Sequence, residues 1–243
     1  MKSGYNQSPD GRDPGSGSGA PPSELRRALS TRVAKVILAV TLLLGLLAAV
    51  GLVAGLPPAA RTLAAVATPV QSLMSVTAPF LGVLMTTRLR SAHLTTRLPT
   101  LLAAVAVAVG VALFGVAVSA LAVAAAPSAG TDGTWQHTAA IVLGCVVVQV
   151  IAQLVGTGLG LLVRRPVLAC IATILLPLGL WAILGAAEST RPAQDWLTPF
   201  AGVGRLTTGA MTAHHWLQSV VVFLLWGVGL NALGAARVAR GLR

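Results

Sequence analysis

Charged residues are scarce in this chain. Asp, Glu, Lys and Arg together make up 9% of its 243 residues, and only 6 residues are acidic. About a quarter of the residues in a soluble domain are charged. A chain of this composition cannot cover a soluble surface with charge, which argues against an ordinary soluble enzyme or binding domain.

Aromatic residues and cysteines are also scarce. Aromatic residues make up 4% of the chain, so the stacking platforms with which proteins hold nucleobases are missing. The net charge of +11 does not indicate nucleic acid, because the basic residues lie at the ends of apolar runs. The two cysteines, Cys145 and Cys170, form neither a CxxC pair nor a metal-ligand spacing. We therefore expect no nucleic-acid partner, no metal and no cofactor.

Apolar residues are abundant, at 55% of the chain, and the mean hydropathy is +0.83. Several apolar runs exceed the roughly 18 residues at which a membrane-spanning helix is the default interpretation. A transmembrane β-barrel would show short alternating segments instead. The sequence predicts an all-α, polytopic membrane protein with six spans, at residues 33–56, 63–86, 99–126, 139–163, 166–187 and 216–236.

Two further segments complete the predicted organisation. Residues 1–22 are rich in Gly, Ser and Pro and predict a disordered cytoplasmic tail, which leaves 23–243 as the six-helix transmembrane domain. Residues 193–210 are partly apolar but interrupted by Pro199 and three glycines. This stretch is too short to span, so it predicts a re-entrant segment in the outer leaflet before the last span.

The basic residues predict the orientation. Six spans place both termini on one side, and 14 of the 17 Lys and Arg residues fall there, including Arg164 and Arg165 in the turn after the fourth span. The positive-inside rule therefore places both termini in the cytoplasm. The excess of Arg over Lys, with abundant Ala, Val, Leu and Gly, suggests a GC-rich bacterial genome and hence a bacterial plasma membrane.

The predicted spans lack catalytic chemistry. No Asp, Glu or Arg falls near the middle of a span, although ion-driven carriers and pumps usually need such residues. The chain has no phosphate-binding Walker A loop, no HExxH motif and no Gly-x-Ser-Gly nucleophile. We expect no catalytic residue and no enzymatic activity in this chain, and any uphill transport would need energy from another subunit.

The fourth span carries a polar stripe. Gln149, Gln153, Gly156 and Gly160 share one face of the predicted helix. One interpretation is packing within the chain, because small residues allow close helix approach. The other is a polar face that lines a conduit or a seam between subunits.

Four stretches together resemble the permease subunit of type-2 ABC exporters in its six-span bacterial form. They are "SELRRALSTRV" (23–33), "LGVLMTTRLRSAHLTTRLP" (81–99), "GTGLGLLVRRPVLACIATILLPL" (156–178) and "AQDWLTPFAGVGRL" (193–206). The family usually carries a glutamate just after the second span, whereas residues 86–98 hold no acid here. This departure keeps open an alternative, a non-transporting membrane scaffold or regulatory protein of the same shape.

The resemblance implies a function and partners. A member of this family is the membrane-spanning subunit of an exporter, is energised by a separate cytoplasmic ATPase, and works as a homodimer or heterodimer of permeases. In the family the loop after the second span meets the ATPase, which implies a contact through Arg88, Arg90, Leu94 and Arg97. We expect Arg164 and Arg165 on the same cytoplasmic face.

The predicted orientation can be tested with reporter fusions. A reporter that is active only outside the cytoplasm should give no signal when it is fused after Arg243, because the positive-inside rule holds that end inside. The same reporter inserted at Asp132 should be active. An active fusion at Arg243 would contradict the six-span topology.

Overall fold

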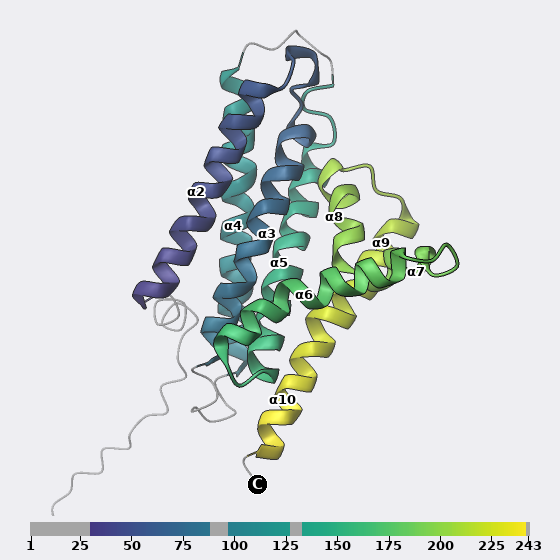
Figure 1. Cartoon of the computed structure of the whole chain (residues 1–243). Helices are drawn as coiled ribbons and strands as arrows, with labels where there is room; N and C mark the ends of the chain where they lie inside the picture. Colours follow the sequence, from purple (N-terminus) through teal and green to yellow (C-terminus); the bar gives the residue numbers. More distant parts are fainter. Residues whose placement is uncertain (1–29, 88–96, 127–132, 242–243) are drawn as a thin grey trace, which may run out of the picture.

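The computed structural model describes residues 30–87, 97–126 and 133–241, and within these ranges the chain is helical and contains no strand (Figure 1). The predicted tail at 1–22 lies outside the described residues. The long helices are α2 (Arg32–Gly55), α3 (Leu63–Thr87), α4 (Arg97–Ala125), α5 (Thr138–Leu162) and α6 (Pro166–Gly185). The shorter elements are η1 (Pro58–Ala60), α7 (Arg191–Leu197), α8 (Pro199–Thr208), α9 (Ala213–Val222), the π-helical segment η4 (Phe223–Gly229) and α10 (Leu230–Gly241).

Among the described residues, six helices are long and apolar enough to cross a membrane. Five of them are α2 to α6, and the sixth is the continuous stretch Ala213–Arg240 that α9, η4 and α10 form together. The prediction of an all-α polytopic protein with six spans is thus confirmed. The last span begins a few residues before the predicted start at 216, because Thr212 caps the helix: its hydroxyl accepts a hydrogen bond from the backbone N–H of His215.

Helices α3 and α5 form the centre of the bundle and pack backbone against backbone. A Cβ atom added at Gly156 of α5 would collide with the Pro79 carbonyl oxygen of α3. A Cβ at Gly82 of α3 would lie 2.6 Å from the Gln153 carbonyl oxygen of α5. In a bilayer, where lipid is as apolar as a side chain, this close approach of small residues is what favours helix association.

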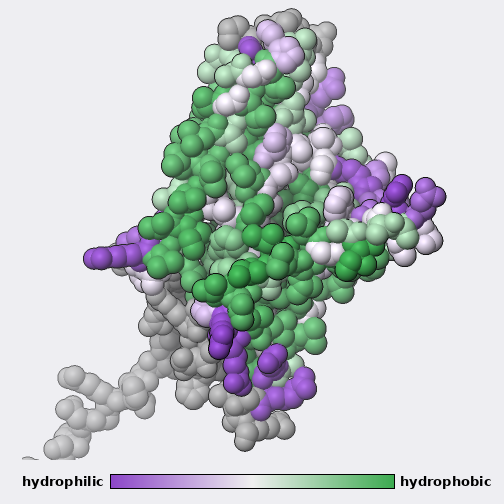
Figure 2. Space-filling view, in the orientation of Figure 1, coloured by the Kyte–Doolittle hydropathy of each residue, from purple (hydrophilic) through white to green (hydrophobic). Residues whose placement is uncertain are grey.

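Helices α2 and α6 lie at the outside of the bundle. Most of their large apolar side chains are exposed, such as Leu47 of α2 and Leu175 of α6. Figure 2 shows this apolar surface as a broad region between hydrophilic groups at the lower end and at the right-hand side. In water such a surface would be very unfavourable, and in a bilayer it faces hydrocarbon chains.

The short helices α7 and α8 form the segment before the last span. Gly209, just after α8, packs beside His137 at the start of α5, and Leu206 of α8 meets Gly144 of α5 through its backbone. The other end of α8, at Pro199, reaches Ile151 near the midpoint of α5. Between α6 and α9 the chain therefore follows α5 from about its midpoint, at Pro199, to its start, at Gly209, and then comes back to α9, which begins beside α7 (Figure 1).

The contact between α3 and α5 predicts a large effect of side-chain bulk at Gly156. Gly156→Leu should lower the thermal midpoint of the purified protein in detergent, because the added atoms meet the rigid backbone at Pro79. Overpacking of this kind costs about 1–3 kcal/mol or more. The matched control is Gly110→Leu in α4, where an added Cβ meets no atom within 4 Å. Equal midpoints for the two variants would contradict the close packing of α3 and α5.

Candidate functional site

A pair of buried glutamines ties the three central helices together. The Nε2 atom of Gln149 donates to the side-chain Oε1 of Gln71 at 2.8 Å and to the Gln71 carbonyl oxygen at 3.0 Å. The Nε2 atom of Gln71 donates to the carbonyl oxygen of Ala112 in α4 at 2.8 Å. Both side chains have no exposed surface. The amides therefore satisfy most of their hydrogen-bonding groups away from water, as buried polar groups must.

Gln153 inserts its amide into helix α3 next to Pro79. In the amide orientation that gives both atoms partners, Nε2 donates to the carbonyl oxygen of Ala78 at 2.5 Å, and Oε1 accepts from the N–H of Gly82 at 3.1 Å. In a regular α-helix Ala78 and Gly82 would bond each other. The side chain thus supplies partners to α3 where the proline bends the helix, as apolar surroundings require.

Asn231 joins the last span to α5. Its Nδ2 atom donates to the carbonyl oxygens of Leu154 at 2.8 Å and Gly227 at 2.6 Å, and its Oδ1 accepts from the Thr157 hydroxyl at 2.8 Å. The sequence analysis did not single out this residue. The signal that could have identified it is one Asn between two apolar stretches of the last span, 220–230 and 232–236.

The polar stripe of the fourth span faces α3. Gln149, Gln153, Gly156 and Gly160 are all buried, and the contacts described for each of them lead to α3. Gly160 lies against Thr86 and Val83 of that helix. The four residues form the seam between two spans of one chain, and none of them is at the exposed surface.

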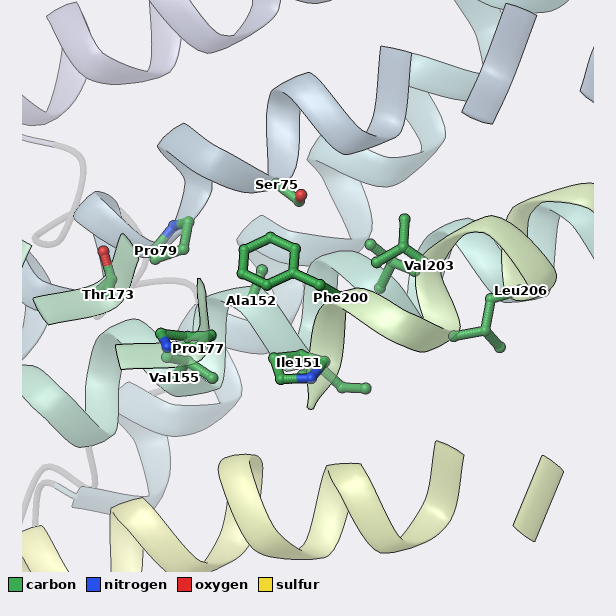
Figure 3. A pocket seen from close by; sticks show the side chains of 12 residues that line it. Ser75, Pro79, Ile151, Ala152, Val155, Thr173, Pro177, Phe200, Val203 and Leu206 are labelled. Carbon is green, nitrogen blue, oxygen red and sulfur yellow. The ribbon is translucent and has the colours of Figure 1, made fainter. Parts of the chain in front are cut away.

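A cavity of about 50 Å³ lies between α3, α5, α6 and α8. Three prolines from three different helices line it, Pro79, Pro177 and Pro199, and Figure 3 labels the first two. Its polar side chains are Ser75 and Thr173, and their hydroxyls donate to carbonyl oxygens of their own helices, at Ser72 and Cys170. The walls that remain are aliphatic and aromatic.

A second, more polar hollow lies on the other side of Pro199 and contains an ion pair. Arg205 of α8 holds Asp195 of α7 in a bidentate contact, with Nη2–Oδ1 at 2.6 Å and Nη1–Oδ2 at 3.1 Å. Trp226 of the π-helical segment donates from Nε1 to the Leu197 carbonyl oxygen at 2.7 Å. The two contacts fix the bend between α7 and α8 against the last span. Within the described ranges, no three His, Cys, Asp or Glu side chains come together as a metal site.

The predicted cytoplasmic contact residues fall partly within the structure. Arg88, Arg90 and Leu94 lie outside the described residues, and Arg97 is the first residue of α4. Arg164 and Arg165 are exposed in the turn between α5 and α6. Contacts of Gly160 with α3 and of Gly234 with Leu161 place the ends of α3, α5 and α10 together. The turn therefore lies at the same end of the bundle as the two helix ends that flank residues 88–96.

Comparisons with known proteins do not identify a family for this chain. Neither models of protein families, nor curated proteins, nor solved structures give a match.

The glutamine pair predicts energetic coupling between α3 and α5. Gln149→Leu should destabilise the protein, because it leaves the buried Oε1 of Gln71 without its donor. The double variant Gln71→Leu, Gln149→Leu should cost less than the sum of the two single variants, with a coupling energy of about 0.6–1.7 kcal/mol. The measurement is equilibrium unfolding in mixed detergent. Additive effects would contradict a direct bond between the two amides.

Proposed function

We propose that this chain is the membrane-spanning permease subunit of an ATP-binding-cassette exporter, driven by a separate cytoplasmic ATPase subunit. The observation that carries the proposal is the six-span helical fold with a bent pair of short helices, α7 and α8, before the last span. This arrangement agrees with the family that the four sequence stretches resemble.

The distribution of charge supports a transporter in which a different subunit supplies the energy. In the described residues, the charged side chains of the six spans lie at helix ends: Arg32 and Lys35 begin α2, while Arg237 and Arg240 end α10. The interiors of the spans hold uncharged amides and hydroxyls. Proton- and ion-driven carriers rely on ionisable groups at that depth, so a carrier without them depends on another source of energy.

The basic end of the bundle offers a surface for the ATPase subunit. Arg164, Arg165, Arg237 and Arg240 are exposed there, and the two acidic residues in the described ranges, Glu188 and Asp195, lie in the segment between α6 and α8. In the proposed orientation this end and both termini face the cytoplasm of a bacterial cell. The exposed apolar surfaces of α2 and α6 leave room for a second permease chain as well as for lipid.

The proposal predicts that an ATP-hydrolysing subunit copurifies with the chain. The chain should be expressed with its chromosomal neighbours, extracted in mild detergent and assayed for bound ATPase activity. Leu94→Asp should release the ATPase while the spans still insert, because a charge at an apolar docking residue opposes burial. Leu94→Met is the matched control and should retain the ATPase.

Two outcomes would contradict this proposal. If no nucleotide-hydrolysing subunit is retained by the unaltered chain, the scaffold or regulatory alternative replaces the exporter. If Leu94→Asp and Leu94→Met retain the ATPase equally, the loop at 86–98 is not the contact that the resemblance implies.

A further inference from the structure

The cavity between α3, α5, α6 and α8 lies near the middle of the membrane-spanning region. Ser75 is at the midpoint of α3, and Ile151 is one residue from the midpoint of α5. Both helices are long enough to cross the hydrocarbon core of a bilayer, which is about 30 Å thick. The cavity therefore lies at about the middle of α3 and α5, next to the hollow that holds the Asp195–Arg205 ion pair on the other side of Pro199.

The shape of the cavity follows from its prolines and its small residues. Pro79 and Pro177 lie inside α3 and α6, where each removes a backbone N–H and bends its helix. Ala152 of α5 presents only a methyl group to the space between them (Figure 3). Bent helices that meet across a small side chain cannot close on one another, so a space remains.

The chemistry of the walls favours a hydrocarbon occupant over water. A volume of about 50 Å³ exceeds the roughly 10–15 Å³ that one water needs, but a buried water also needs two to four polar partners. Here the hydroxyls of Ser75 and Thr173 already donate within their own helices. The other side chains of the wall are carbon only, so they gain dispersion contacts from methylene and methyl groups.

The cavity opens toward the lipid-facing surface. Phe200 lines it but is 38% exposed, which places this ring at its mouth. Leu73 and Val76, which come two residues before and one residue after Ser75 in the sequence, are exposed, as are Leu176 and Leu178 on either side of Pro177. In a membrane these exposed residues of α3 and α6 contact acyl chains, so hydrocarbon lies against two of the helices that form the cavity.

We propose that this cavity binds the end of an acyl chain from a bilayer phospholipid, which passes Phe200 and contacts Ile151 and Val155 of α5. The site needs neither an ATPase nor a transported substrate, so a test of the site does not depend on whether the proposed function is correct. It also explains why the protein keeps an apolar space at the junction of four helices, since lipid fills a volume that would otherwise lack van der Waals partners.

Photo-crosslinking in proteoliposomes of the chain alone tests the proposal. The probe is phosphatidylcholine with a diazirine near the methyl end of one acyl chain, and mass spectrometry locates the labelled residues. Bulk lipid labels exposed residues such as Leu175. Ile151 and Val155 are only 4% and 3% exposed, so label on these two residues reports a chain inside the cavity.

Two variants with opposite expected effects on the labelling of Ile151 and Val155 distinguish lipid binding from a folding defect. Ala152→Phe should fill the cavity and remove most of the label from Ile151 and Val155, whereas Phe200→Ala should widen the mouth and increase it. Leu143→Phe, at an exposed position of the same helix, is the matched control and should leave the label unchanged.

Three results would overturn the proposal. The first is label confined to exposed residues of the unaltered chain. The second is equal labelling of Ile151 and Val155 in the Ala152→Phe and Leu143→Phe variants. The third comes from proteoliposomes without the lipid probe, in which a photoreactive amino acid replaces Phe200: a crosslink between two protein chains in place of lipid would assign the mouth of the cavity to a second copy of the chain.

Discussion

The backbone contact between α3 and α5 is the constraint on which the other features depend. Gly156 lets the Pro79 carbonyl approach α5, and the amide of Gln153 then reaches the two backbone groups of α3 that flank the bend. A proline in a membrane-spanning helix is tolerated only where neighbouring groups satisfy the backbone that it disturbs. The bend in α3, the polar stripe of α5 and the small residues between them are therefore one structural unit.

The same unit shapes the two hollows on either side of Pro199. Because α3 bends at Pro79 and α6 at Pro177, the four helices leave a space that Phe200 covers only in part. On its other side, Pro199 begins α8 directly after the bend that the Asp195–Arg205 ion pair and the Trp226 indole hold in place. The π-helical segment, a rare element that is often found at functional sites, thus contacts the bend between α7 and α8.

The charge distribution determines which functions this chain can support. Away from their ends, the described residues of the six spans offer neutral amides, hydroxyls and apolar side chains, which can align helices and hold hydrocarbon, whereas the Asp195–Arg205 ion pair lies in α7 and α8, outside the spans. The exposed arginines at one end can attract an acidic protein surface or anionic headgroups, with each basic residue near an anionic surface contributing about 1 kcal/mol. Both the exporter proposal and the acyl-chain site use these features without any catalytic group.

The sequence by itself determined the fold class, the number of spans and most of their boundaries. Runs of about 20 apolar residues have one stable solution in a bilayer, because every backbone N–H and C=O must be paired within the segment. It also identified Gln149, Gln153, Gly156 and Gly160 as one helical face, since helical periodicity needs no tertiary information.

Only the tertiary structure decided which residues this helical face contacts. The partners Gln71, Ala78 and Asn231 lie 74 or more positions away in the chain from the α5 residues to which they bond. Periodicity within one helix carries no information about a neighbouring helix. The cavity likewise exists only where four helices, two of them bent by prolines, come together.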